Sequence, residues 1–216
     1  MKAMLVIGEV TLPLGGAALV AVLNELIKMN ADEKVSPAWD QVLATLAEHP
    51  DPAFRRMVCG ATSVPLSVLT QLASDREISV IHALIEDSDD WDLLEAEDRK
   101  AQRLEHSTQI LSFVPEYTVR RWLSWPCLQL QLALANNMGK FSAACEMLIA
   151  DTLVKHPSYK VREVIANDGG ISRDYHEILV GDEDPHVSAM AAQTLVFMAD
   201  MMDSWDSDDS EDEDED

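Results

Sequence analysis

Apolar residues recur three and four positions apart along most of the chain, in short stretches that turns separate. Two such stretches run from 14 to 29 and from 37 to 48. This spacing places the apolar side chains on one face of an α-helix, so the pattern predicts an all-α body of short helices without a sheet. Thr11 and Pro13, before the first stretch, are typical of a helix entry with a cap residue and an early proline. The apolar segment 1–10 fits either a strand or the start of a helix.

A phrase that begins with a proline turn and continues as an amphipathic helix recurs in the same register. It reads His-Pro-Asp-Pro-Ala-Phe-Arg-Arg-Met-Val at 49–58 and His-Pro-Ser-Tyr-Lys-Val-Arg-Glu-Val-Ile at 156–165, with weaker copies at 115–123 and 182–191. Recurrence of this kind is the signature of a repeat array, whose units are too small to bury their apolar faces alone. The residues that we expect to pack between units are Phe54, Val119, Val161, Val164, Ile165 and Val187.

Five segments of the two good copies carry a resemblance to a known repeat family. They lie at 55–58 (Arg-Arg-Met-Val), 64–69 (Val-Pro-Leu-Ser-Val-Leu), 72–75 (Leu-Ala-Ser-Asp), 161–167 (Val-Arg-Glu-Val-Ile-Ala-Asn) and 178–185 (Ile-Leu-Val-Gly-Asp-Glu-Asp-Pro). These segments resemble units of the leucine-rich repeat variant, within 46–86 and 153–192, and an acidic insertion over 87–103 interrupts the resemblance. The resemblance implies a right-handed α-solenoid of short helix pairs, akin to HEAT and armadillo arrays.

Charge divides the chain into two parts. The last fourteen residues, from Asp203, hold ten of the 39 acids and no base, and the net charge of the whole chain is −23. Without them, 29 acids stand against 16 bases, so the remainder is still near −13. We expect a helical repeat domain over 1–202 and a disordered acidic tail over 203–216, because a run of like charges cannot offset the entropy cost of ordering. A field of this sign repels nucleic acid and anionic membranes and attracts basic partners.

The sequence contains no motif that indicates catalysis or a cofactor. Cys59, Cys127 and Cys145 are far apart and form no Cys-x-x-Cys, so we expect reduced thiols and no zinc ribbon. His49 and His156 stand at equivalent positions before a proline, which predicts structural turn residues, and the six histidines lack metal-ligand spacing. We therefore expect a protein that is not an enzyme and needs no cofactor or metal. Without export or membrane signals, we expect it in the cytoplasm.

Arginine and tryptophan, two residue types that dominate interface hot spots, are concentrated at 120–125, after the proline turn at Pro115. The candidate partner-binding residues there are Arg120, Arg121, Trp122 and Trp125. The alternative for Trp122 is a core position equivalent to Met57 and Val164, which leaves Trp125 as the more exposed ring. A second candidate set lies in the tail and consists of Asp208, Asp209, Glu211, Asp212, Glu213 and Asp214. The tail either attracts a basic partner or only solubilises the chain, and Ser207 and Ser210 lie among its acids, as an acid-directed kinase requires.

Two classes of function fit these observations. The first is a non-catalytic protein-binding module, a helical solenoid that binds one basic protein and inhibits, escorts or scaffolds it, without direct contact to nucleic acid or membrane. The alternative is an enzyme on a HEAT-like solenoid, of the base-excision glycosylase or chromophore lyase type. A glycosylase needs a basic concave face for DNA, and no run of lysine and arginine crosses successive units. We therefore expect the binding module, and the sequence leaves the partner's identity and the oligomeric state open.

Overall fold

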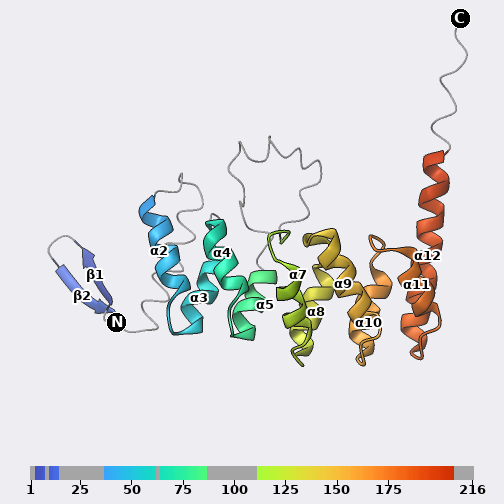
Figure 1. Cartoon of the computed structure of the whole chain (residues 1–216), viewed down its shortest axis with the longest axis horizontal. Helices are drawn as coiled ribbons and strands as arrows, with labels where there is room; N and C mark the ends of the chain where they lie inside the picture. Colours follow the sequence, from blue (N-terminus) through green and yellow to red (C-terminus); the bar gives the residue numbers. More distant parts are fainter. Residues whose placement is uncertain (1–2, 8–9, 15–36, 62–63, 87–110, 207–216) are drawn as a thin grey trace, which may run out of the picture. The chain divides into compact units, whose positions relative to one another are not determined.

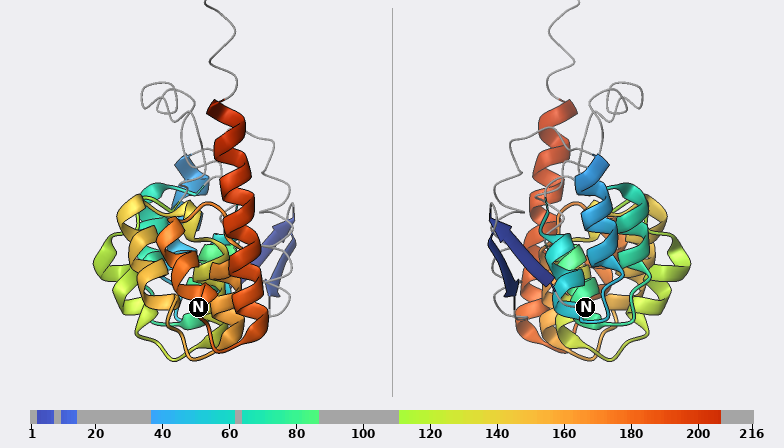
Figure 2. Two further views of the ribbon diagram at one scale, coloured as in Figure 1. Left: turned by 90° about the vertical axis from the view of Figure 1, so that its right-hand side faces the viewer. Right: turned by 90° about the vertical axis from the view of Figure 1, so that its left-hand side faces the viewer.

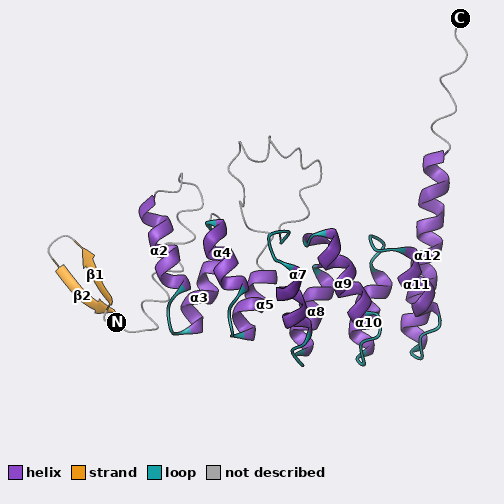
Figure 3. Ribbon diagram, in the orientation of Figure 1, coloured by secondary structure: helices purple, strands orange, loops and turns teal. Residues whose placement is uncertain are grey.

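The computed structural model describes residues 3–7, 10–14, 37–61, 64–86 and 111–206. By its internal contacts the chain forms two compact units, Met1–Phe113 and Val114–Asp216. Figures 1 and 3 show that every regular element described between 37 and 206 is a helix. This confirms an all-α fold for that part of the sequence, whereas a single helical domain over 1–202 stays a prediction.

A two-stranded antiparallel hairpin precedes the helices. β1 spans Ala3–Ile7 and β2 spans Val10–Leu14, and the two strands pair along their whole length. The expectation of no sheet is therefore wrong at this end, and Thr11 and Pro13 lie in a strand rather than at a helix entry. Valine, isoleucine and threonine favour strands, and proline is tolerated because both strands of a hairpin are edge strands. The helix predicted over 14–29 falls outside the described residues beyond Leu14.

Helices that are two apart in the chain pack side by side in the first unit. Its described helices are α2 (Pro37–Ala47), α3 (Pro52–Cys59), α4 (Leu66–Ala73) and α5 (Ile78–Glu86). α2 contacts α4 and α3 contacts α5, so two short rows form (Figure 1). Leu43, Val58 and Leu72 are fully buried between these helices. The bounds of α2 agree with the helix predicted over 37–48.

The second unit has the same kind of rows. Its described helices are α7 (Glu116–Leu123), α8 (Leu128–Asn136), the 3₁₀ turn η3 (Met138–Lys140), α9 (Ala143–Leu153), α10 (Tyr159–Asn167), α11 (Arg173–Val180) and α12 (Pro185–Asp206). α7 contacts α9, and α10 contacts both α8 and α12. The C-terminal half of α12 extends past the other helices of its unit (Figures 1 and 2). Among the described helices, none is both long and apolar enough to cross a membrane.

Capping residues and proline set the helix starts. Asp51 precedes α3 and accepts a hydrogen bond from the backbone N–H of Ala53 at 2.9 Å, with Pro52 at the first helical position. The missing N–H of proline is harmless there because the first N–H groups of a helix lack intrahelical partners. Apart from α12, the α-helices have only eight to eleven residues. Helices of this length are marginal alone, so packing between them supplies their stability.

The burial pattern of α10 sets the register of its core face. Val161 and Ile165 are fully buried, as predicted, because they lie one turn apart on the face toward the neighbouring helices. Val164 is only half-buried, so its prediction as a full core residue is wrong. Phe54, three residues after its N-cap as Val161 is, is buried, and Val119 on α7 is buried too. Full burial of each such side chain contributes about 1.5–3 kcal/mol. Val187 on α12 is buried as well.

Candidate functional site

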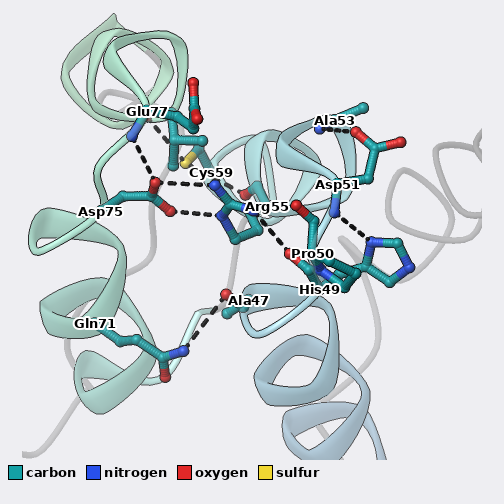
Figure 4. A network of polar contacts seen from close by, with 11 residues as sticks. Ala47, His49, Pro50, Asp51, Ala53, Arg55, Cys59, Gln71, Asp75 and Glu77 are labelled. Carbon is teal, nitrogen blue, oxygen red and sulfur yellow. Dashed lines mark hydrogen bonds and ion pairs between the residues drawn. The ribbon is translucent and has the colours of Figure 1, made fainter.

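One arginine side chain ties two turns of the first unit together (Figure 4). Arg55 on α3 reaches the turn before α5, where its Nε and Nη2 donate to the carboxylate of Asp75 at 2.6 and 3.0 Å. Its Nη1 donates to the backbone carbonyls of His49 and Pro50, in the turn before α3, at 2.8 and 3.0 Å. A single guanidinium therefore connects the starts of two neighbouring helices. We call this arrangement the arginine joint.

The second unit contains the same arginine joint 107 positions later, from 55 to 162. Arg162 on α10 donates through Nε and Nη2 to Asp182 at 2.6 and 2.8 Å. Its Nη1 donates to the carbonyls of His156 and Pro157, at 2.7 and 3.3 Å. The arginine and aspartate side chains are at most 13% exposed in both joints. Buried pairs with this two-pronged geometry fix the arrangement of the chain, and losing one partner is costly because the other charge is left buried.

His49 and His156 are turn residues, as predicted. The Nδ1 atom of each ring accepts a hydrogen bond from the backbone N–H two residues further on, at 3.1 and 3.0 Å. Asp75 and Asp182 accept the equivalent hydrogen bonds through a carboxylate oxygen, at 2.8 and 2.9 Å. An acceptor at this place satisfies a backbone donor at the helix start. Histidine and aspartate therefore serve the same structural purpose, which is to accept the backbone N–H two residues further on. This hydrogen bond accounts for His49 and His156 as structural residues of the turn.

Each arginine joint holds its aspartate in the ionised form. Burial alone would raise the pKa of Asp75, but the hydrogen bonds from Arg55 and from the backbone outweigh it and lower that pKa below its usual value. The hydrogen bond from Arg162 is the main cause of the lowered pKa of Asp182, against the opposing effect of burial. Opposite charge and hydrogen bonding to the charged form both favour ionisation. The joints are thus permanent ion pairs near neutral pH rather than proton donors or acceptors.

The weaker copy predicted at 115–123 is not the counterpart of the arginine joints. It forms α7, which lies in the row of α9, whereas α8 lies in the row of α10. The counterpart is the turn that begins with Trp125. Gln131 on α8 stands four residues after the N-cap, as Arg55 and Arg162 do, and its Nε2 donates to the Trp125 carbonyl at 3.1 Å. The signal in the sequence is a Trp-Pro turn in place of His-Pro, and the proline turn before α7 obscured it.

Trp122 is a core residue, and its prediction as a partner-binding residue is wrong. The side chain on α7 is fully buried. Its ring meets the ring of Phe141 edge to face, with 6.3 Å between the centroids and 72° between the planes. Edge-to-face aromatic pairs stabilise a core beyond the area that they bury. Its burial exceeds that of Met57 and Val164, the half-buried positions considered for it from the sequence.

Arg120 and Arg121 lie in the last turn of α7, and Trp125 lies in the turn after it. The Arg120 side chain is exposed and lies 3.4 Å from the carboxylate of Glu116 on the same helix, a surface pair of small energetic weight. The guanidinium carbon of Arg121 lies 5.6 Å from the ring centroid of half-buried Trp125, within cation–π range. The contact between Arg121 and Trp125 lies within the candidate set, whereas Arg120 pairs with a residue outside it. Its role in partner binding stays a prediction.

The segment predicted as an acidic tail begins within a helix. α12 continues to Asp206, four residues into the segment predicted as tail. The six candidate acids from Asp208 to Asp214 lie outside the described residues, as do Ser207, Ser210 and the insertion over 87–103. Within the described part of the chain, no three His, Cys, Asp or Glu side chains gather as a metal ion requires.

The sequence did not predict two features of α11 and α12. His176 on α11 is fully buried, and neither ring nitrogen has a hydrogen-bond partner among the described residues. Val196 and Phe197 on α12 are 63% and 59% exposed. A helical apolar pattern predicts burial of valine and phenylalanine, so only the structure reveals that these two side chains are exposed. A lone histidine in the sequence likewise gives no sign of burial.

No protein family, curated protein or solved structure matches this chain.

Proposed function

We propose that the chain is a non-catalytic protein-binding module, a right-handed α-solenoid related to the leucine-rich repeat variant that binds one basic protein. The observation that carries this proposal is the arginine joint, because it recurs with the same atoms at the same spacing in both units. Recurrence of one joint supports an array of stacked units. Stacked arrays present extended surfaces for binding, and the bound protein would be inhibited, escorted or held in place.

Exposed charge supports a basic partner. Where side chains are described, the exposed acids are Glu48, Asp51, Glu77, Glu86, Glu116, Asp151, Asp174, Glu177, Glu183 and Asp200. The exposed bases in the same part are Arg56, Arg76, Arg120, Lys155, Lys160 and Arg173. Arg55 and Arg162 are engaged in the joints and add little to the surface field. The resulting negative field favours encounter with a basic protein and opposes binding to DNA, which a solenoid glycosylase would need.

The test is affinity capture with the full chain from its native host, followed by purification of the captured protein and measurement of binding with the two pure proteins. An unrelated acidic protein of similar charge, immobilised in parallel, removes proteins that bind any anionic surface. We expect a basic partner whose association rate falls as salt rises, because screening acts over about 8 Å at physiological ionic strength. An acidic partner, or binding that ignores salt, would contradict the proposal.

A further inference from the structure

The outer side of α12 carries apolar side chains where a surface helix normally carries polar ones. Gln193, Val196, Phe197 and Asp200 are exposed and fall three and four positions apart, so they line up along one face of the helix. We call these four residues the α12 stripe. The opposite face of the same helix buries Val187, Ala191 and Thr194 against the rest of the unit. Val196 and Phe197, 63% and 59% exposed, are neighbours on this solvent-facing side, and contiguous exposed apolar side chains are typical of interaction sites.

The charge of α12 near the stripe is negative, and no lysine or arginine of the helix neutralises it. α12 contains Asp200, Asp203 and Asp206 but no lysine or arginine, and eight further acids follow from Asp208 to the last residue. The C-terminal end of a helix already carries partial negative charge, where cations are favourable and anions unfavourable. Asp200 and the negative C-terminal end of the helix therefore favour a cationic group on another molecule.

We propose that the α12 stripe binds a basic amphipathic helix of the partner. The partner helix lays its apolar face on Val196 and Phe197 and places lysine or arginine side chains beside Asp200 and the C-terminal turns of α12. A helix fits because the stripe follows one straight helix face, and amphipathic helices engage such faces with apolar anchors three and four residues apart. The α12 helix of a second copy has no lysine or arginine to place beside Asp200, and an anionic membrane has the wrong charge. The inference rests on the proposed function and adds the surface and the element of the partner.

The experiment uses the full chain and three synthetic peptides of about 18 residues, long enough to form an amphipathic helix. The first has leucine at helical spacing and lysine elsewhere, the second replaces lysine with glutamate, and the third replaces leucine with serine. Affinities are measured by calorimetry for the wild type, Phe197→Ser and Val196→Ser. The matched control is Leu66→Ser, which removes a side chain that is 53% exposed on α4. Melting temperatures of all variants verify that each remains folded.

We expect the leucine–lysine peptide to bind and the other two peptides to bind much more weakly. Phe197→Ser should weaken binding about tenfold or more, as loss of an interface anchor does, and Val196→Ser should act in the same direction. Leu66→Ser should bind like the wild type. Equal binding of the leucine–lysine peptide to Phe197→Ser and Leu66→Ser, or no binding to the wild type, would overturn the inference. So would self-association of the chain that Phe197→Ser abolishes.

The captured natural partner separates this inference from the proposed function. If a basic protein binds the wild type and Phe197→Ser equally well, the α12 stripe is wrong and the proposed function stands. If no basic protein binds the full chain under the capture conditions, the proposed function fails, whatever the peptides do.

Discussion

The four helices α2–α5 of the first unit and α9–α12 of the second unit share their joint and differ in the length of their last described helix. Both blocks join two turns through one arginine, an aspartate 20 residues later and two backbone carbonyls. The last described helix of the first block, α5, spans Ile78–Glu86, whereas α12 of the second block spans Pro185–Asp206. The shared joint organises the helices of both blocks. Among the described residues, the C-terminal half of α12 is where a binding function is best sought.

A second difference lies inside the two blocks. Leu69 on α4 and His176 on α11 are 107 positions apart, as the joint arginines are, and both are fully buried. The leucine suits an apolar site, whereas the histidine leaves two ring nitrogens without a hydrogen-bond partner among the described residues. A buried polar group without a partner loses its hydrogen bonds to water and gains nothing in return. The second block should therefore be less stable at this position than its counterpart.

The largest effect should come from breaking a joint. Arg162→Ala leaves the Asp182 carboxylate buried and unpaired and should lower the free energy of unfolding by about 3–5 kcal/mol, and Arg55→Ala should do the same in its own block. The matched control is Arg173→Ala, which removes an exposed pair with Glu177 and should cost less than about 1 kcal/mol. Urea titration followed by circular dichroism measures all three variants. Similar losses for Arg162→Ala and Arg173→Ala would show that the joint is not structural.

A smaller change in the free energy of unfolding, of opposite sign, should follow when position 176 is given the leucine that the first block has at position 69. His176→Leu should stabilise the chain by about 1–3 kcal/mol, because it removes two buried groups that lack partners. Leu69→His should destabilise the first block, since it creates the same defect there. Thermal unfolding of both variants checks the pair of predictions. A lower melting temperature for His176→Leu would mean that the ring makes a contact outside the described residues.

Acid should weaken both joints together. The pKa values of Asp75 and Asp182 are lowered in the folded chain, so folding is favoured above the unfolded pKa of about 3.9 and this contribution is lost as pH falls through the folded pKa values. Stability should therefore stay level from neutral pH to about pH 5 and decline below about pH 4. Asp182→Asn should flatten part of this decline. An unchanged acid profile in that variant would show that the joint does not control it.

The smallest effect on stability should come from the tail. Truncation after Asp206 removes eight acids and should change the free energy of unfolding by less than about 0.5 kcal/mol. The same truncation should slow association with the captured basic partner at low salt and leave dissociation almost unchanged, because a run of like charge steers encounter over long range. Stopped-flow or biosensor rates across a salt series measure this. If the association rate and its salt slope do not change, the tail only solubilises the chain.

The sequence predicted local features better than pairings. Helix and turn positions around His49 and His156 followed from proline and apolar spacing, and the burial of Val161 followed from the helical period. The predicted register in the middle of the chain is wrong because proline turns precede both α7 and α8, and only the contacts between helices distinguish the two turns. Nothing local marks the pairing of Arg55 with Asp75, since 20 positions and the whole of α4 separate the two residues in the sequence.

The candidate site was hardest to predict because burial of aromatic and charged residues depends on neighbours. Tryptophan is a residue type common both in interface hot spots and in cores. The packing of Trp122 against Phe141 shows that this one belongs to the core. Val196 and Phe197 are residue types that are usually buried in a core. They are exposed because no further helix among the described residues of the unit covers them.

One pair of measurements on two variants tests most directly whether the arginine joint stabilises the fold and the α12 stripe binds the partner. Unfolding free energy and affinity for the leucine–lysine peptide are measured in the same two variants, Arg162→Gln and Phe197→Ser. Arg162→Gln should lower stability by about 3–5 kcal/mol and, where the chain remains folded, bind the peptide within about twofold of wild type. Phe197→Ser should change stability by less than about 0.5 kcal/mol and weaken the peptide about tenfold or more. The opposite pattern, binding lost with the joint and kept without the phenylalanine, would contradict this division of roles.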